Sequence, residues 1–114
     1  MNTREIASLI NGTLITPGMD DEKPFTMAFA SDLMSDVLTV DCSNLLLITG
    51  LLNVQTIRTA EMSEIGCIVL VRNKKATPEM IALAAESNIC LIESPYSLFR
   101  ASGLLYQSGI NPVY

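Results

Sequence analysis

The sequence predicts an α/β fold in which helices cover a parallel β-sheet. Two observations support this prediction. Short apolar segments rich in Ile, Leu and Val recur every 22 residues, as LLLIT from 45, CIVLV from 67 and ICLIE from 89. Each segment is also followed by residues typical of a helix start. Because a helix fits between successive strands, we expect parallel βαβ units with right-handed crossovers from residue 45 onward.

The first forty residues predict shorter and less regular elements. In order, these are a helix over 4–10, a strand over 13–16, an acidic connecting loop over 17–24, a strand over 25–30 and a helix over 32–38. We expect Thr3 to cap the first helix and Gly12 to end it. Ser31 and Asp32 are expected to cap the second helix.

Each of the three repeated strands is followed by an expected helix. These helices span 54–65, 78–87 and 96–107. Their expected N-terminal residues are Asn53, Thr77 and Ser94, and proline follows the last two, as is favoured at the first helical position. Gly66 and Asn88 are expected to take the left-handed conformation that ends the first two helices.

The composition favours a small domain with an unusually apolar surface. A chain of 114 residues builds one modest core, so we expect a single domain over 1–114. Apolar residues make up 49%, charged residues 17%, and the mean hydropathy is +0.38. This apolar excess predicts a subunit interface. The net charge of −5 and the scattered basic residues argue against nucleic acid and anionic membranes as partners.

The sequence contains no histidine, which removes His-based triads, His metal ligands and the commonest general base. Its three cysteines lack the CxxC spacing of a metal site, and we expect Cys67 and Cys90 to be buried in strands and Cys42 to lie in a turn. We therefore expect no metal, no cofactor and no catalytic residue. The polar N-terminus and the absence of an apolar run of roughly 18–20 residues predict a cytoplasmic chain.

Four segments carry a resemblance that covers nearly the whole chain in order. They are AFASDLMSDVL (28–38), LLLITGLLNVQTIRTAEM (45–62), IVLVRNKKATPEMIALA (68–84) and SLFRASGLLY (97–106). In these segments the chain resembles the DRTGG domain family, whose members stand alone or form regulatory segments of phosphotransacetylases and CBS-domain pyrophosphatases. The resemblance implies a fold similar to the N-terminal domains of HPr kinase and the muramyl-peptide ligases. It also implies a dimeric domain that is not itself known for catalysis.

The chain departs from this family at the residues that give the family its name. Members typically carry Asp-Arg after a Thr-Gly step, and Thr-Gly-Gly after the next strand. Here Thr49-Gly50 is kept, but Leu51-Leu52 replaces Asp-Arg and Val71–Asn73 replaces Thr-Gly-Gly. Of the signature, only Thr49-Gly50 transfers to this chain.

Polar and small residues at the carboxyl ends of the expected strands are candidates for a binding site, because ligands of open parallel sheets bind there. The candidate ligand-binding residues are Ser31, Asp32, Thr49, Gly50, Asn53, Arg72, Asn73 and Ser94. Together with the N–H groups of helix N-termini, their side chains could hold a small anionic or nucleotide-like ligand. The Thr-Gly step lacks the Gly-Lys-Ser/Thr of a P-loop.

Structural alternatives exist for the same residues. Asn53, Ser94 and Ser31 have the chemistry of helix caps, and Gly50 could serve only a tight turn. Arg72 could form a surface ion pair. We expect Asp32, with Asp36 one turn later, to favour the helix dipole rather than to act as an acid/base pair.

The last expected helix has two apolar stripes. One contains Leu98, Ala101 and Leu105, and the other contains Tyr96, Phe99, Gly103 and Tyr106. The sheet would cover the first stripe, and a second subunit could cover the second, which makes it the candidate dimer interface. Alternatively, the N-terminal helix covers the second stripe within the chain.

The leading interpretation is a non-catalytic, cytoplasmic, homodimeric domain that regulates or senses a small-molecule ligand. The alternative is a protein-interaction module that docks on a partner enzyme through a hydrophobic surface. A third and weaker interpretation is an enzyme that uses Asp32, Arg72 or a cysteine.

Overall fold

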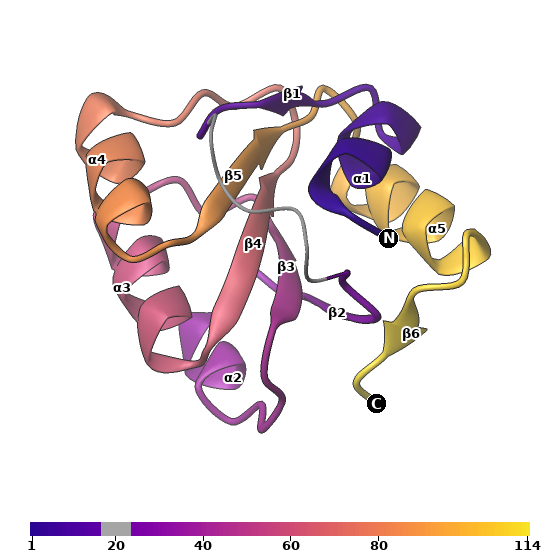
Figure 1. Ribbon diagram of the computed structural model, residues 1–114, viewed down its shortest axis with the longest axis horizontal. Coiled ribbons are helices and arrows are strands. Elements are labelled where there is room, and N and C mark those ends of the chain that lie inside the picture. Colours follow the sequence, from indigo (N-terminus) through magenta and orange to yellow (C-terminus); the bar gives the residue numbers. More distant parts are fainter. Residues whose placement is uncertain (17–23) are drawn as a thin grey trace.

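The computed structural model describes residues 1–16 and 24–114, so all of the predicted loop over 17–24 except Pro24 lies outside the described residues. The described residues form three layers, with a sheet between two groups of helices (Figure 1). The strands are β1 (Thr13–Leu14), β2 (Met27–Ala30), β3 (Leu45–Thr49), β4 (Ile65–Leu70), β5 (Cys90–Glu93) and β6 (Asn111–Pro112). The helices are α1 (Thr3–Leu9), α2 (Met34–Val37), α3 (Val54–Met62), α4 (Pro78–Glu86) and α5 (Leu98–Gln107).

The described strands form one sheet in the order β1-β5-β4-β3-β2-β6. Strands β2 to β5 are parallel, and β6 joins β2 in the same direction. Strand β1 pairs antiparallel with the far edge of β5. The predicted parallel βαβ units from residue 45 onward are therefore confirmed.

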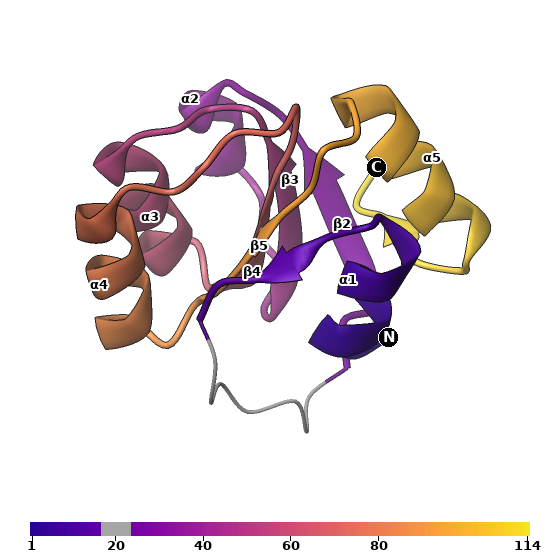
Figure 2. The same cartoon turned by 90° about the horizontal axis from the view of Figure 1, so that it is seen from above.

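Alternate side chains of the central strands face opposite helical layers. In β3, Leu45 and Leu47 pack with α2, α3 and α4, whereas Leu46 and Ile48 pack with α1 and α5. Figure 2 shows these two groups of helices on opposite sides of the sheet. Every residue of β3 is buried. Burial on both faces explains why the repeated segments are continuously apolar.

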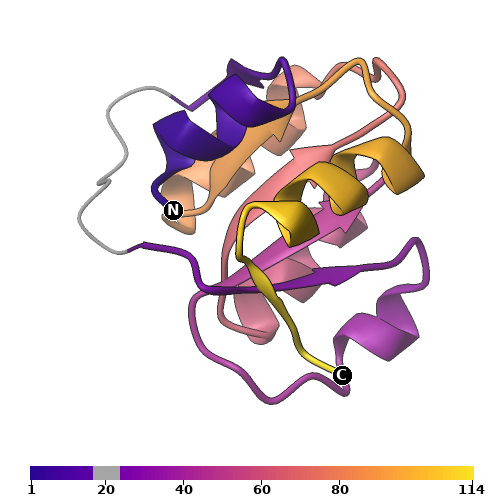
Figure 3. The ribbon, with the colours of Figure 1, turned by 90° about the vertical axis from the view of Figure 1, so that its right-hand side faces the viewer.

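The order in which the chain forms its strands determines which helices cover each face of the sheet and where the strand ends lie. Strands β2 to β5 follow one another across the sheet, and α2, α3 and α4 connect them over a single face. The chain then crosses to the other face as α5 and returns to β6 beside β2 (Figure 3). The carboxyl ends of four parallel strands thus meet at one edge, and among the described helices only α1 and α5 cover the second face.

Two of the expected helix starts are confirmed. Asn53 Oδ1 accepts a hydrogen bond from Thr56 N at 3.0 Å, and Thr77 Oγ1 accepts one from Met80 N at 3.2 Å. Asn88 has φ 57° and ends the α4 segment in the left-handed conformation, as predicted.

The expected caps of the first helix are wrong by one residue at each end. Asn2, rather than Thr3, caps α1 in a capping box, in which Asn2 Oδ1 accepts from Glu5 N and Glu5 Oε1 accepts from Asn2 N. Asn11, rather than Gly12, takes the left-handed conformation, with φ 52°. Asparagine tolerates both positions because its short polar side chain bonds to nearby backbone.

Gly66 does not end α3, as had been expected. The left-handed residue after this helix is Glu64, with φ 57°, and Gly66 lies inside β4. A methyl group added at Gly66 would lie 2.5 Å from Asn44 Oδ1 and 2.9 Å from Phe25 Cε1. Glycine is needed here because the Asn44 side chain and the buried Phe25 ring both approach the strand too closely for a side chain.

The last helix begins later than the sequence predicts. Helix α5 starts at Leu98, and its cap is Ser97, whose Oγ accepts from Arg100 N at 3.1 Å. Ser94 is buried instead, where its Oγ donates to Ile10 O at 2.7 Å and accepts from Tyr96 N at 3.2 Å. Ser94 thereby ties the β5–α5 connection to the end of α1.

Cys67 and Cys90 are buried in β4 and β5, as predicted. Cys42 is half-buried in the connection between α2 and β3. Across residues 1–16 and 24–114, the helices are all too short or too polar to cross a bilayer.

We predict that Gly66→Ala lowers the free energy of unfolding by about 1–3 kcal/mol, the usual cost of overpacking a core. The added methyl group meets the Phe25 ring. Urea denaturation measures this loss, and in a Phe25→Leu background it should shrink by at least about 0.5 kcal/mol because the two sites are in contact. An equal loss in both backgrounds would show that Phe25 is not the obstacle.

Candidate functional site

The carboxyl ends of β2, β3, β4 and β5 lie along one edge of the sheet, which we call the carboxyl edge. Strand β2 is parallel to β3, with Ala30 opposite Ile48, so the edge includes the end of β2 as well. The carboxyl edge comprises residues 31–32, 49–51, 71–76 and 93–96.

The peptide groups around Gly50 are held by side chains from both neighbouring strand ends. Asp32 Oδ1 accepts hydrogen bonds from Gly50 N at 2.6 Å and from Thr49 Oγ1 at 3.1 Å. On the other side, Lys74 Nζ donates to Gly50 O. The N–H and the C=O of Gly50 are therefore both engaged by charged groups.

The expected roles of Ser31 and Asp32 as helix caps are wrong. Helix α2 begins only at Met34, and its N-cap position is Leu33. Ser31 Oγ accepts from Leu33 N at 3.0 Å in the turn before the helix. Asp32 faces the end of β3 instead of the helix dipole, because the Gly50 N–H offers its carboxylate a charge-assisted hydrogen bond.

The guanidinium of Arg72 lies directly over Gly50. A methyl group added at Gly50 would lie 2.9 Å from Arg72 Nη2 and 3.2 Å from Nε. Among the described residues only Gly109 is a glycine with positive φ, so Gly50 is not required by a left-handed turn. Its missing side chain makes room for the guanidinium.

Arg72 is exposed, and within the described ranges its guanidinium makes no ion pair. The alternative of a surface ion pair is thus not found there. Arg72 and Asn73 are consecutive left-handed residues, with φ 63° and 58°. Two backbone hydrogen bonds hold this unfavourable turn, from Arg72 N to Tyr96 O at 2.8 Å and from Asn73 N to Ser94 O at 3.0 Å. Strained backbone of this kind is often found at functional sites.

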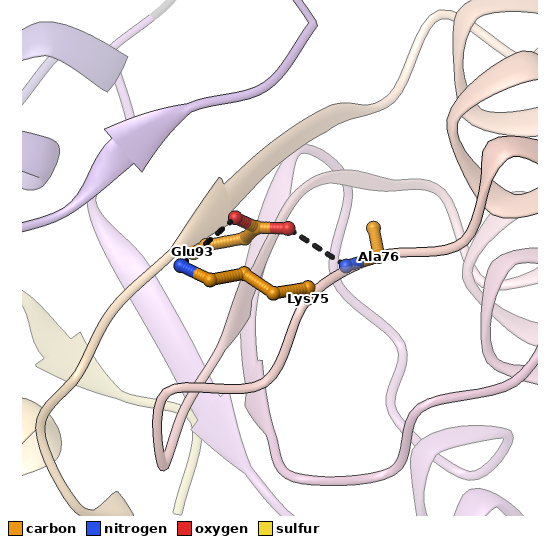
Figure 4. Close-up of polar contacts among 3 residues, drawn as sticks. All are labelled: Lys75, Ala76 and Glu93. Atoms are coloured by element: carbon orange, nitrogen blue, oxygen red, sulfur yellow. Dashed lines mark hydrogen bonds and ion pairs between the residues drawn. The ribbon is translucent and has the colours of Figure 1, made fainter.

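A buried carboxylate anchors the connection between β4 and α4. Glu93, 8% exposed at the end of β5, accepts from Ala76 N at 2.7 Å through Oε2 (Figure 4). Its Oε1 lies 3.6 Å from Lys75 Nζ. The sequence analysis missed both Glu93 and Lys74. The available signal for Glu93 was a charged residue ending the otherwise apolar segment ICLIE.

The connections after β4 and β5 diverge to opposite faces of the sheet, which is where doubly wound folds open a ligand crevice. Here the two connections are joined by the backbone hydrogen bonds of Arg72 and Asn73, and by Glu93. The Arg72 guanidinium, which is an exposed cationic group of this edge, lies next to β3, over Gly50.

The carboxyl edge concentrates positive charge in an acidic chain. Of the seven basic residues, Arg72, Lys74 and Lys75 belong to the β4–α4 connection, and Arg100 stacks on Tyr96, with Cζ 3.8 Å from the ring centroid. Asp32 and Glu93, the carboxylates of the edge, both accept hydrogen bonds from backbone N–H groups. An anion would find a cationic contact here despite the net charge of −5.

The remaining candidate ligand-binding residues either have structural roles or have exposed side chains. Asn53 is a helix cap, and Thr56 beside it donates from Oγ1 to Leu51 O at 2.9 Å. Ser31 and Ser94 serve the turns described above. Asn73 is exposed beside Arg72. In the part of the chain that the structure describes, no three His, Cys, Asp or Glu side chains converge as metal ligands would.

The outer face of α5 is a second candidate surface. Ala101 and Leu105 are buried against the sheet, which confirms the first apolar stripe. Phe99 and Tyr106 are 89% and 69% exposed, although α1 packs beside α5. The alternative that α1 covers these two side chains is therefore wrong. Tyr96 precedes the helix and is half-buried, so it does not belong to the outer stripe.

Comparison with known proteins supports the fold. No family model and no curated protein matches this chain. The chain superposes, with a TM-score of 0.77, on the crystal structure of the CBS and DRTGG domains of the regulatory region of Clostridium perfringens pyrophosphatase, complexed with its activator diadenosine tetraphosphate. The two are 18% identical, and the match covers 96% of this chain and 47% of that chain. This chain thus has a DRTGG-like α/β fold and spans about half the length of its neighbour.

We predict that Asp32→Ala lowers the free energy of unfolding by about 1–2 kcal/mol, because the N–H of Gly50 loses a charged acceptor. Asp36→Ala is the matched control. Asp36 is exposed, and within the described residues its carboxylate accepts no hydrogen bond, so we expect a change below about 0.5 kcal/mol. Urea denaturation distinguishes the two variants, and equal effects would remove Asp32 from its clamping role.

We further predict that Glu93→Leu costs about 1–3 kcal/mol of stability, because the N–H of Ala76 is left without its acceptor. Glu93→Gln should cost less, since an amide oxygen can still accept that bond. Lys75 is 68% exposed, and Lys75→Ala should cost no more than about 0.5 kcal/mol. A larger loss from Lys75→Ala than from Glu93→Leu, measured by urea denaturation, would contradict this assignment.

Proposed function

We propose that residues 1–114 form a single, non-catalytic regulatory domain that binds a small anionic, nucleotide-like ligand at the carboxyl edge. The observation that carries the proposal is the exposed guanidinium of Arg72, seated over Gly50 without an ion-pair partner among the described residues. Arginine binds carboxylates and phosphates through two parallel hydrogen bonds.

The neighbouring structure supports the regulatory part of this proposal. That protein is the regulatory region of a pyrophosphatase, and it was crystallised with a dinucleotide activator. A dinucleotide joined by phosphates is an anionic ligand of the class that the carboxyl edge would attract. Because this chain has a DRTGG-like fold, we propose that it also binds a phosphate-containing ligand. Substitution of Arg72 tests this proposal.

The chemistry of the edge favours binding over catalysis. The chain has no histidine, and both carboxylates of the edge accept backbone hydrogen bonds that hold the connections in place. A general base must be free to reach its substrate. We therefore propose a domain that transmits the presence of its ligand rather than converting it. We keep the expectation from the sequence that this domain is cytoplasmic.

A second function is favoured by a different observation. Phe99 and Tyr106 are large apolar side chains exposed on one helix, and such patches mark protein contacts. We propose that the domain acts as a homodimer through this surface. A module that docks on a partner enzyme is the alternative use of the same face.

We predict that Arg72→Ala weakens binding of the ligand by about 1.5–3 kcal/mol, the range for a charge-assisted hydrogen bond. A thermal-shift screen of nucleotides, with diadenosine tetraphosphate and inorganic phosphate included, identifies the ligand, because a molecule that binds only the folded state raises Tm. Isothermal titration then gives its Kd for the wild type and the variant.

Arg58→Ala is the matched control, because Arg58 is an exposed arginine on α3, away from the carboxyl edge. It removes the same charge and should leave Kd unchanged. Arg72→Lys should retain part of the affinity through its charge. Equal losses in Arg72→Ala and Arg58→Ala would point to general electrostatics and remove Arg72 from the site.

A further inference from the structure

A groove of about 240 Å³ lies beside α5, above β2 and β6. Its lining consists of Ala28, Ala30, Ile48, Ser102, Leu105, Tyr106, Ile110, Asn111 and Pro112. No charged residue lines it. Ser102 Oγ is buried here, and in the described part of the chain it has no hydrogen-bond partner. Strand β2 contributes only the small side chains of Ala28 and Ala30 to this lining.

One side of α5 runs from this groove to the solvent. At 3.6 residues per turn, Ser102, Tyr106, Phe99 and Gly103 follow one another around the helix. Ser102 and Tyr106 line the groove, and Phe99 and Gly103 are exposed next to them. A methyl group added at Gly103 would meet no atom of the described residues within 4 Å. The helix surface is therefore flat between two protruding aromatic rings.

We propose that the occupant of the groove is Phe99 of a second copy of this chain. In the proposed dimer, the two α5 helices pack antiparallel about a two-fold axis that passes near Ser102 and Gly103. The residue three before Ser102 then lies opposite the residue three after Gly103. These residues are Phe99 and Tyr106, so the Phe99 ring of one copy enters the groove that Tyr106 lines in the other.

Charge favours a second copy over a different partner. A two-fold contact brings the same patch onto itself, so any charged residue in it would face its own kind. The groove and the outer stripe of α5 carry no charged side chain, although the chain has a net charge of −5. This face can therefore meet its own copy without like-charge repulsion.

The available area is also of the right order. Two copies contribute four aromatic side chains, Phe99 and Tyr106 twice, each burying about 150–250 Å² at most. Together they supply about 600–1,000 Å², which is a large part of the roughly 1,200–2,000 Å² of a stable interface. The groove walls and the ridge of α5 would add the rest. This α5–α5 contact rests on the proposed homodimer and specifies which residues form its interface.

Sedimentation equilibrium of the wild type and three variants tests the contact. We expect a dimer whose Kd rises about thirtyfold or more in Phe99→Ser and in Tyr106→Ser, as for hot-spot residues. Met62→Ser is the matched control, because Met62 is also a large exposed apolar side chain, 73% exposed, but ends α3 on the opposite face of the sheet. Its Kd should stay within about twofold of the wild type.

Two further variants test insertion into the groove while leaving both aromatic rings in place. Ala30→Leu fills the groove from its own chain, and Gly103→Leu holds the two helices apart. Both should raise the dimer Kd at least about tenfold. Both should fold as well as the wild type, as judged by urea denaturation under monomeric conditions, because neither position is packed against its own chain and leucine favours helices over glycine.

A wild type that remains monomeric at high micromolar concentration overturns the inference, and the groove then belongs to another partner. A dimer that tolerates Phe99→Ser, or that is unaffected by Ala30→Leu, also overturns it. Failure of the proposed ligand site is distinguished from failure of the dimer contact by a ligand titration. All five variants keep Arg72, so each should still bind inorganic phosphate or diadenosine tetraphosphate at the carboxyl edge, whether or not the dimer forms.

Discussion

The winding of the sheet is the constraint on which the rest of the structure depends. Because α2, α3 and α4 all connect parallel strands over one face, only α1 and α5 of the described helices remain to cover the other. Those two helices pack on β5, β4 and β3, and the small residues Ala28 and Ala30 of β2 are left beside an open groove. The same winding aligns four strand ends at one edge. Both candidate surfaces thus follow from a single topological choice.

The Thr-Gly step looks like a phosphate-binding turn in sequence, but its hydrogen bonds give it a different role. Asp32 accepts from the N–H of Gly50, so this N–H cannot also donate to a bound anion. Lys74 occupies the carbonyl oxygen of Gly50 on the other side. Gly50 of the Thr-Gly step instead leaves space, because it has no side chain, and the Arg72 guanidinium lies over it. An anion bound at this edge, as we propose, would therefore be held by side chains rather than by a backbone cradle.

The sequence predicted the elements with a strong local signal and failed where distant contacts compete for the same residue. The 22-residue period located β3, β4 and β5, because burial on both faces requires continuous apolar segments. Gly66 is a residue type that often ends helices, but here it lies in β4, close to Asn44 and the Phe25 ring. Ser94 is a residue type that often caps helices, but its hydroxyl donates to Ile10 O instead. The hydrogen bond that Asp32 accepts from Gly50 N spans 18 residues, and the one that Lys74 donates to Gly50 O spans 24 residues. No local pattern specifies pairs so far apart.

Helix α5 joins the two surfaces physically. Before its first turn, Tyr96 accepts from the N–H of Arg72 and stacks under Arg100, whereas Ser102 and Tyr106 farther along the helix line the groove. A shift of the Arg72 turn on ligand binding would therefore act on the residue that leads into α5, the helix of the proposed dimer contact. By linkage, a ligand that binds the dimer more tightly than the monomer strengthens the dimer by the same factor. The proposed regulatory function requires such a path between ligand and partner, and the hydrogen bond from Arg72 N to Tyr96 O would provide it.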